Sequence, residues 1–366
     1  MTTAKAAVLR TIGAAPAIES VKLEEPRADE VLIEMRGVGI CHTDMVMRDG
    51  HLPVPLPVVL GHEGSGIVRA LGSDVTDLAV GDHVVLSFMS CSHCPSCADS
   101  DPAYCHSWVP LNFFGARSDG STALTDAAGA PVHSHVFGQS SFATHAVVNR
   151  RNTVKVDKDL PIELLGPLGC GIQTGAGAVL NACRVRAGSS VAVIGAGAVG
   201  LSAVMAAGIA GASIITAVDI NPARLDLALS LGATAQGSSG DFISLAAEAG
   251  CPTGFDYIID TTGIPALVNA AILALAPRGE LALVGAYPAK ADLCADLTHL
   301  MSAGRVVRGV VEGSANPQEF IPQLIAFHRK GRFPFDRLVQ YFAFEDIAAA
   351  IAAGENGQVV KPIVRF

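Results

Sequence analysis

The feature that most constrains the fold of this 366-residue chain is a glycine-rich turn between two apolar segments. Gly195, Gly197 and Gly200 spell G-x-G-x-x-G directly after the apolar run at residues 191–194, and Asp219 closes the next apolar run. This order of strand, turn, helix, strand and acid is typical of a dinucleotide-binding unit. The glycines permit a tight turn and let the pyrophosphate approach the helix N-terminus.

The acidic residue at the end of the second run predicts NAD rather than NADP. The Asp219 carboxylate can accept hydrogen bonds from both ribose hydroxyls and would repel a 2′-phosphate. Arg224 lies five residues further on and could bind such a phosphate, so NADP stays an alternative at this point. The alternative interpretation is a glycine-rich turn that binds no ligand. The complete order of strand, turn, helix, strand and acid favours a cofactor site.

The pattern around this turn predicts an α/β fold. Apolar runs at residues 214–218, 257–260 and 281–285 alternate with helical segments. Strands that alternate with helices form a doubly wound parallel sheet with helices on both faces.

The rest of the chain has a different pattern. Short β-type runs at residues 31–38, 67–71 and 83–86 are separated by glycine and proline, which predicts a β-rich domain. We expect residues 108–137 to form a surface loop. After residue 311 we expect an amphipathic helix and a final short strand that return to the β-rich domain.

Charge and hydropathy exclude several classes of partner. The chain has 25 basic and 34 acidic residues, which argues against binding to nucleic acid or to anionic membranes. Residues 187–218 carry no charge and are long enough to span a bilayer. Six glycines in this stretch favour a buried strand, turn and helix instead. Lys5 and Arg10 interrupt any export signal, so we expect a cytoplasmic protein.

Four cysteines predict a structural metal site. Cys91, Cys94, Cys97 and Cys105 form C-x2-C-x2-C-x7-C. In a reducing compartment, four clustered thiolates can surround a tetrahedral zinc ion and leave no open position. An iron–sulfur cluster is the alternative, but ferredoxin runs close with a gap of three residues and then proline.

A second group of metal-binding residue types is dispersed along the chain. Cys41 occurs in GICHTD, His62 in GHEGSG and Cys170 in PLGCGIQTG. At these separations, spacing alone also suits ordinary core packing.

Five separated motifs together resemble the zinc-dependent medium-chain alcohol dehydrogenases, from about residue 6 to residue 366. They are GICHTD, GHEGSGIV, the four-cysteine loop, PLGCGIQTG and VIGAGAVG, in the family's order. The stretches VPLPVVLGHEGSG, FGQSSFATHA and GRFPFD are most similar to the aryl-alcohol (benzyl alcohol) dehydrogenases.

The resemblance implies a Rossmann cofactor domain beside a GroES-like catalytic domain. The expected boundaries are a catalytic domain at 1–170 with the structural zinc loop at 91–105, a cofactor domain at 171–310, and a return to the catalytic domain at 311–366. It also implies a homodimer or homotetramer joined through edge strands near residues 306–311.

The resemblance assigns the dispersed residues to a catalytic zinc. Cys41, His62 and Cys170 match its ligands, so the chain would hold two zinc ions in all. Glu63 matches a residue beside this metal, and Asp44 matches the partner of His62.

Other matched positions concern the alcohol and the cofactor. Thr43 matches the residue that hydrogen-bonds the alcohol oxygen, and His42 and Lys361 match residues that meet the pyrophosphate. Zinc would lower the pKa of the alcohol so that a zinc-bound alkoxide gives a hydride to the nicotinamide, reversibly. In many relatives the position of Val46 is a histidine that releases the proton. We expect water to do this here, with His51 as the alternative relay.

The resemblance implies an apolar pocket. Such a lining suits benzyl alcohol and related primary aromatic alcohols, with the corresponding aldehydes as products. Allylic terpene alcohols such as geraniol or perillyl alcohol are the alternative. A quinone or enone reductase is disfavoured because such relatives generally lack the zinc ligands; a non-catalytic NAD- and zinc-binding protein is the alternative of another class. The implied lining residues are Leu52, Phe88, Val136, Phe137, Ala286 and Val311.

Overall fold

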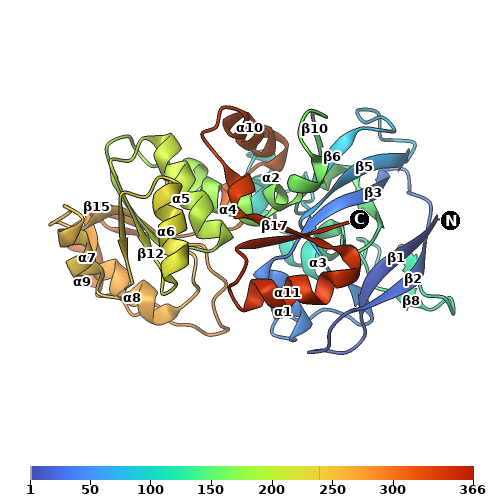
Figure 1. Cartoon of the computed structure of the whole chain (residues 1–366), viewed down its shortest axis with the longest axis horizontal. Coiled ribbons are helices and arrows are strands. Elements are labelled where there is room, and N and C mark those ends of the chain that lie inside the picture. The colour runs from blue at the N-terminus through green and yellow to red at the C-terminus, as the bar shows by residue number, and fades with distance from the viewer. Residues whose placement is uncertain (1, 239) are drawn as a thin grey trace. The chain divides into compact units, whose positions relative to one another are not determined.

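The computed structural model describes residues 2–238 and 240–366, which form two compact units (Figure 1). Unit 1 contains the described residues up to Gly171 together with 316–323 and 336–366. Unit 2 contains residues 172–315 and 324–335. None of the helices in the described ranges is long and apolar enough to cross a membrane.

Unit 1 is built on two sheets. The smaller sheet has the strand order β4-β1-β2-β7-β8. The larger sheet has the order β10-β6-β5-β3-β18-β17, and β9 also pairs with β3. The strands are β1 (Thr2–Leu9), β2 (Ala17–Leu23), β3 (Glu30–Gly39), β4 (Val58–Val59), β5 (Gly64–Leu71), β6 (His83–Leu86), β7 (Leu124–Thr125), β8 (Pro131–Val132), β9 (His145–Asn149), β10 (Thr153–Val156), β17 (Val339–Ala343) and β18 (Lys361–Arg365).

The C-terminal strand completes the larger sheet. β18 runs antiparallel to β3, with Ile363 opposite Gly39. This register places Lys361, the first residue of β18, beside the end of β3 and the start of the segment that carries Cys41. The helices of unit 1 are α1 (His42–Arg48), α2 (Pro95–Ala98), α3 (Trp108–Phe113) and α11 (Ile347–Glu355).

Unit 2 has the predicted doubly wound sheet. Its strands are parallel, in the order β13-β12-β11-β14-β15-β16, and β11 is buried along its whole length. Figure 1 shows α5 and α6 on one side of this sheet and α7 and α8 on the other. The strands are β11 (Ser190–Ile194), β12 (Ile214–Val218), β13 (Ala235–Gly237), β14 (Phe255–Asp260), β15 (Leu275–Leu283) and β16 (Val306–Gly309).

The helices of unit 2 follow the strands in alternation, as the sequence predicts. They are α5 (Ala198–Ala210), α6 (Pro222–Ser230), α7 (Phe242–Glu248), α8 (Pro265–Leu273) and α9 (Leu297–Ser302). Two further helices include residues of both units, α4 (Gly171–Gly177) and α10 (Pro317–Arg329). The uncharged stretch at 187–218 is β11, the glycine turn, α5 and β12, so the interpretation as buried structure is confirmed.

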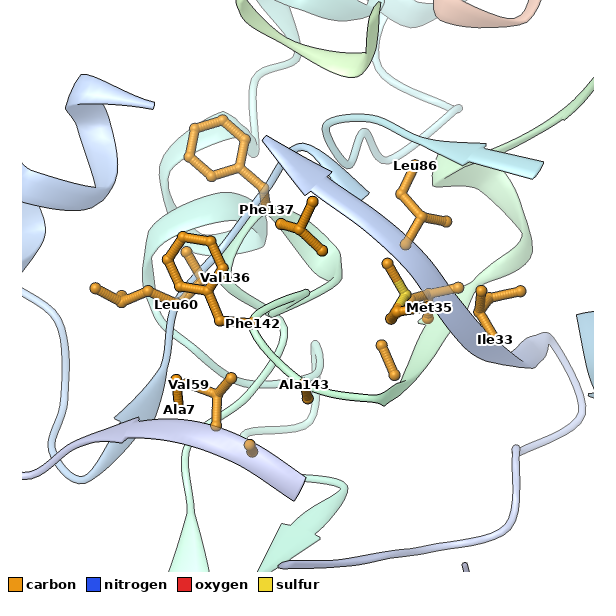
Figure 2. Packing of buried hydrophobic residues seen from close by; sticks show 14 of the residues in the cluster. Ala7, Ile33, Met35, Val59, Leu60, Leu86, Val136, Phe137, Phe142 and Ala143 are labelled. Carbon is orange, nitrogen blue, oxygen red and sulfur yellow. The ribbon is translucent and has the colours of Figure 1, made fainter. Parts of the chain in front are cut away.

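The core of unit 1 gathers side chains from distant parts of the sequence. Figure 2 shows Phe137 and Phe142 in one cluster with Leu60, Met35 and Leu86. The prediction of a surface loop at residues 108–137 is wrong, because this stretch contains α3, β7 and β8. These elements are two to six residues long, too short for a periodic pattern to show in the sequence.

Candidate active site and metal centres

Three dispersed residues of unit 1 converge at one point. The ligand atoms of Cys41, His62 and Cys170 all lie within 4.8 Å of one another. Cys41 immediately precedes α1, His62 lies between β4 and β5, and Cys170 follows the short turn Gly166–Gly169. Two sulfurs and one imidazole nitrogen are ligands that zinc prefers, and three protein ligands leave a fourth position open.

The orientation of the imidazole fits a metal. Nδ1 of His62 lies 2.9 Å from Oδ1 of Asp44, and both side chains have no exposed surface. The same carboxylate accepts hydrogen bonds from the backbone N–H groups of Cys41 and Gly61. Asp44 therefore holds the proton on Nδ1. The other nitrogen, Nε2, is buried and has no hydrogen-bond partner among the described residues, which leaves its lone pair for an ion.

The electrostatics of this group favour a thiolate. The pKa of the Cys41 thiol is lowered well below its ordinary value, chiefly by a hydrogen bond from the side chain of Cys170 and further by His62 and Lys361, although burial opposes the shift. Because the thiolate is the form that binds metal, the lowered pKa prepares the site for zinc. Oγ1 of Thr43 lies 3.8 Å from Sγ of Cys41, so the hydroxyl borders the same site.

A buried ion pair lies next to the ligands. Nζ of Lys361 is 2.8 Å from both carboxylate oxygens of Glu63 and 3.1 Å from the carbonyl oxygen of Ile40. An ammonium group has three N–H donors, so these contacts use all of them. Glu63 has no exposed surface, and the ammonium group compensates its buried charge. The contact of Lys361 with a pyrophosphate stays a prediction. His42, the other residue expected at the pyrophosphate, is exposed at the start of α1.

The four-cysteine loop forms the second candidate metal centre. The sulfur atoms of Cys91, Cys94, Cys97 and Cys105 lie within 4.8 Å of one another, and none is in a disulfide. Backbone N–H groups donate to the sulfurs of Cys91, Cys94 and Cys105 at 3.2–3.4 Å. The pKa of the Cys94 thiol is lowered to about 6, chiefly because the backbone N–H groups of His106 and Cys97 donate hydrogen bonds to its sulfur. Four sulfurs with no open position suit a structural zinc ion.

The glycine turn of unit 2 has the shape that a dinucleotide needs. A β-carbon on Gly200 would lie 1.7 Å from the carbonyl oxygen of Gly195, so only glycine lets α5 pack this closely. Nothing lies within 4 Å of a β-carbon at Gly197, which leaves open space over the N-terminus of α5. Asp219 follows β12 and its Oδ2 accepts a hydrogen bond from the N–H of Ala196 within the turn.

Arg224 lies on α6 beyond this acid. Its Nε is buried and has no hydrogen-bond partner among the described residues, and its backbone N–H bonds to Asn221.

Comparison with known proteins agrees with this site. The model of the alcohol dehydrogenase GroES-like domain matches residues 27–158, and that of the zinc-binding dehydrogenase matches residues 198–329. A geraniol dehydrogenase of Castellaniella defragrans is 49% identical over 367 aligned positions that cover 99% of this chain and 98% of the relative. This chain belongs to the zinc-dependent medium-chain alcohol dehydrogenases.

Two solved structures extend the comparison. An alcohol dehydrogenase zinc-binding domain protein from Burkholderia ambifaria is 51% identical, with a TM-score of 0.97 and coverage of 100% of this chain and 99% of the other. The benzyl alcohol dehydrogenase of Acinetobacter calcoaceticus is 45% identical, with a TM-score of 0.95 and complete coverage of both chains. The family, the fold class and the cofactors zinc and NAD are thus confirmed, and the protein is an alcohol dehydrogenase.

Two of the expected pocket residues, Phe88 and Phe137, belong to a group of aromatic side chains in unit 1. The ring of Phe137 stacks on the imidazole of His62, with centroids 4.4 Å apart. Trp108 and Phe113, both from α3, present their rings edge-on to Phe137, and Phe88 packs against Trp108. These four aromatic residues (Phe88, Trp108, Phe113 and Phe137) are called the aromatic cluster below.

Sequence reasoning missed Trp108 and Phe113 because it assigned their segment to a loop. The signal that could have found them is their position in WVPLNFF, which begins three residues after Cys105, the last cysteine of the zinc loop. The other expected residues lie as follows. Val136 has no exposed surface and belongs to the core cluster of Figure 2, whereas Leu52 is half-buried after α1. Ala286 and Val311 are exposed residues of unit 2.

Proposed function

We propose that this dehydrogenase oxidises primary aromatic alcohols of the benzyl alcohol type to aldehydes, reversibly and with NAD. The observation that carries the proposal is the aromatic cluster, which packs directly on the ligand His62. Flat rings pack edge-to-face or offset against such a wall, with a gain of about 0.5–1.5 kcal/mol per aromatic pair. The benzyl alcohol dehydrogenase at 45% identity supports the same substrate class.

The catalytic chemistry belongs to the group at Cys41, His62 and Cys170. A zinc ion held by these three side chains would supply Lewis-acid polarisation of the alcohol oxygen. Asp44 keeps the imidazole of His62 in one orientation and one tautomer. The hydroxyl of Thr43, at the border of the site, would hydrogen-bond the alcohol oxygen and accept its proton for transfer toward solvent.

The remaining expected sites complete the proposal. Cys91, Cys94, Cys97 and Cys105 would hold a second, structural zinc ion. In unit 2, the glycine turn would hold the pyrophosphate and Asp219 the adenosine ribose, which favours NAD over NADP.

A second substrate class is an allylic terpene alcohol such as geraniol. The geraniol dehydrogenase at 49% identity favours it. Geraniol and benzyl alcohol both carry the hydroxyl on a carbon next to a double bond or ring, and an apolar wall discriminates only weakly between them.

The experiment is a comparison of kcat/KM for benzyl alcohol, geraniol, perillyl alcohol and ethanol, followed as NADH formation. Phe113→Leu removes a ring that faces Phe137 at 5.3 Å, whereas the matched control Phe114→Leu changes a residue that is 58% exposed. We expect Phe113→Leu to lower kcat/KM for benzyl alcohol by about 2–10-fold, with ethanol unchanged. A preference for ethanol by the unaltered enzyme would overturn the substrate class, and a larger loss with geraniol than with benzyl alcohol would favour the terpene alternative.

Zinc content tests the metal sites separately. We expect two zinc ions per chain in the unaltered enzyme, one for each of the two candidate groups. Cys170→Ala should retain one zinc ion and lose activity. A Cys170→Ala variant that retains both ions would contradict the assignment.

A further inference from the structure

The carboxyl end of the sheet in unit 2 contains an acidic residue that the site described above does not use. The order of strands reverses between β11 and β14, which are neighbours. In open α/β sheets, ligands bind at the carboxyl ends of the strands at such a reversal. The glycine turn follows β11 here, and Asp260 is the last residue of β14, paired with Ile194.

Asp260 is a buried carboxylate with a complete set of donors. It has no exposed surface. The hydroxyl groups of Tyr287 and Thr262 donate to it at 2.6 and 2.7 Å, and the backbone N–H groups of Thr262 and Gly263 donate at 3.2–3.3 Å. A buried charge is strongly destabilising unless it is hydrogen-bonded in this way. Each partner is therefore held in place by the carboxylate.

Tyr287 lies in the segment after β15, whereas Thr262 and Gly263 directly follow β14. Burial, and then the hydrogen bond to Asp260, raise the pKa of the Tyr287 hydroxyl, so it remains a donor at any physiological pH. The carbonyl oxygen of Asp260 also accepts hydrogen bonds from the N–H groups of Val284 and Gly285. Side chain and backbone of one residue thus tie the segment after β15 to the end of β14.

Thr261, which follows Asp260, links the end of β14 to the glycine turn. The hydroxyl of Thr261 lies 2.9 Å from the carbonyl oxygen of Ile194 and 3.2 Å from that of Gly195. The turns are also in close contact, because a β-carbon on Gly263 would lie 2.2 Å from the carbonyl oxygen of Ala286. Segments 195–197, 261–263 and 284–287 therefore form one hydrogen-bonded edge with little room to shift.

We propose that Asp260 and Tyr287 are positioning residues for the nicotinamide half of the cofactor. A dinucleotide lies across the reversal point, with one nucleotide on each half of the sheet. Asp219 follows β12, so the adenosine ribose would lie over β11–β13 and the nicotinamide over β14–β16. The hydrogen bond between Asp260 and Tyr287 joins the segments that follow β14 and β15, on the nicotinamide side. The inference rests on the proposed binding of NAD at the glycine turn.

The test compares two ligands that differ only in the nicotinamide ring. NADH binding is followed by fluorescence with the full-length, zinc-loaded protein, and ADP-ribose binding by its competition with NADH. Tyr287→Phe removes one hydroxyl and keeps the ring. Because a hydrogen bond to a buried charge is worth more than one between neutral groups, we expect the Kd for NADH to rise about tenfold. The Kd for ADP-ribose should change less than about twofold.

Two further variants sharpen the result. Thr262→Val removes the other hydroxyl donor to Asp260 and should show the same pattern. Tyr341→Phe changes a half-buried tyrosine of β17 in unit 1 and should leave both affinities unchanged.

Each other outcome decides against the inference. An unchanged Kd for NADH in Tyr287→Phe would overturn it while the proposed function stands. An equal loss for both ligands would also overturn it, because it would show a general loss of structure in unit 2. Failure of the unaltered protein to bind NADH would overturn the proposed function, and the inference with it.

Discussion

The ammonium group of Lys361 forms a buried ion pair with Glu63, residues that lie 298 positions apart in the sequence. The two side chains are 4% and 0% exposed. Removal of one partner would leave the other charge buried without compensation, which typically destabilises a protein by about 3–5 kcal/mol. We expect this loss in the free energy of unfolding of Lys361→Met, measured by urea denaturation.

Two controls separate the pair from a general effect of charge removal. Lys155→Met breaks a pair with Asp82 in which the lysine is 52% exposed, and should cost less than about 1 kcal/mol. The double variant Glu63→Gln/Lys361→Met should be more stable than Lys361→Met alone. Equal stability of these two variants would contradict the coupling.

Asp44→Asn should weaken zinc binding at Cys41, His62 and Cys170. An asparagine can accept hydrogen bonds from backbone N–H groups but does not stabilise the imidazole as a carboxylate does. Loss of such a partner typically lowers metal affinity by about 10–100-fold. Competition with a chelator, with zinc release recorded at each centre, measures the change. Release from the four-cysteine loop should be unaffected, and equal weakening at both centres would indicate misfolding instead.

Asp219→Asn should reduce the preference for NAD. The substitution keeps an oxygen for the N–H of Ala196 but removes the charge that would repel a 2′-phosphate. We expect the ratio of kcat/KM for NAD to that for NADP to fall by about tenfold or more. Loss of the repulsion between the carboxylate and the 2′-phosphate should change the relative binding by about 1.4 kcal/mol or more, which corresponds to about tenfold. The paired variant Asp219→Asn/Arg224→Leu tests whether Arg224 gains the phosphate. If NADP use rises equally in both variants, Arg224 has no part in it.

Val46→His should raise alcohol oxidation at lower pH if release of the proton limits the rate. Val46 lies on α1 three residues after Thr43, a spacing that places both side chains on one face of a helix. An imidazole there can accept and release a proton near neutral pH, which valine cannot. Profiles of kcat against pH for Val46→His, with Val46→Leu as control, measure the effect. The exposed His51 should be dispensable, and an activity loss in His51→Gln would assign the relay to it instead.

Acid should weaken the unit 1 fold through Glu30. Burial alone would raise its pKa, but His135, Arg117 and the backbone of Arg27 lower it from 4.5 to about 2. Because the folded pKa is depressed, this contribution is fully present above pH 4.5 and is lost as the pH falls toward 2.

The size of this contribution can be measured with a charge-neutral variant. We expect Glu30→Gln to lose on the order of 3 kcal/mol at pH 7 and progressively less below pH 4. Glu24→Gln, at a carboxylate 48% exposed that also pairs with Arg117, should lose much less. A pH-independent loss in Glu30→Gln would show that the effect is not electrostatic.

The sequence alone determined the features whose residues are close together in the chain. The glycine turn, the strands on either side of it and the four-cysteine loop follow from local spacing, because their geometry is set within about one supersecondary unit. The separations of Cys41, His62 and Cys170 left core packing open, and only the resemblance to a family assigned them to one metal. The short elements α3, β7 and β8 were missed because they have too few residues to show a period.

Only the tertiary structure decided which distant residues become partners. The pairing of β18 with β3 brings Lys361 to Glu63, which lies 298 positions away in the sequence. The alignment of β14 with β15 brings Tyr287 to Asp260, although neither residue belongs to a motif. Buried charges bind whichever opposite charge or donor the sheet register places beside them, and that register depends on the packing of the whole unit.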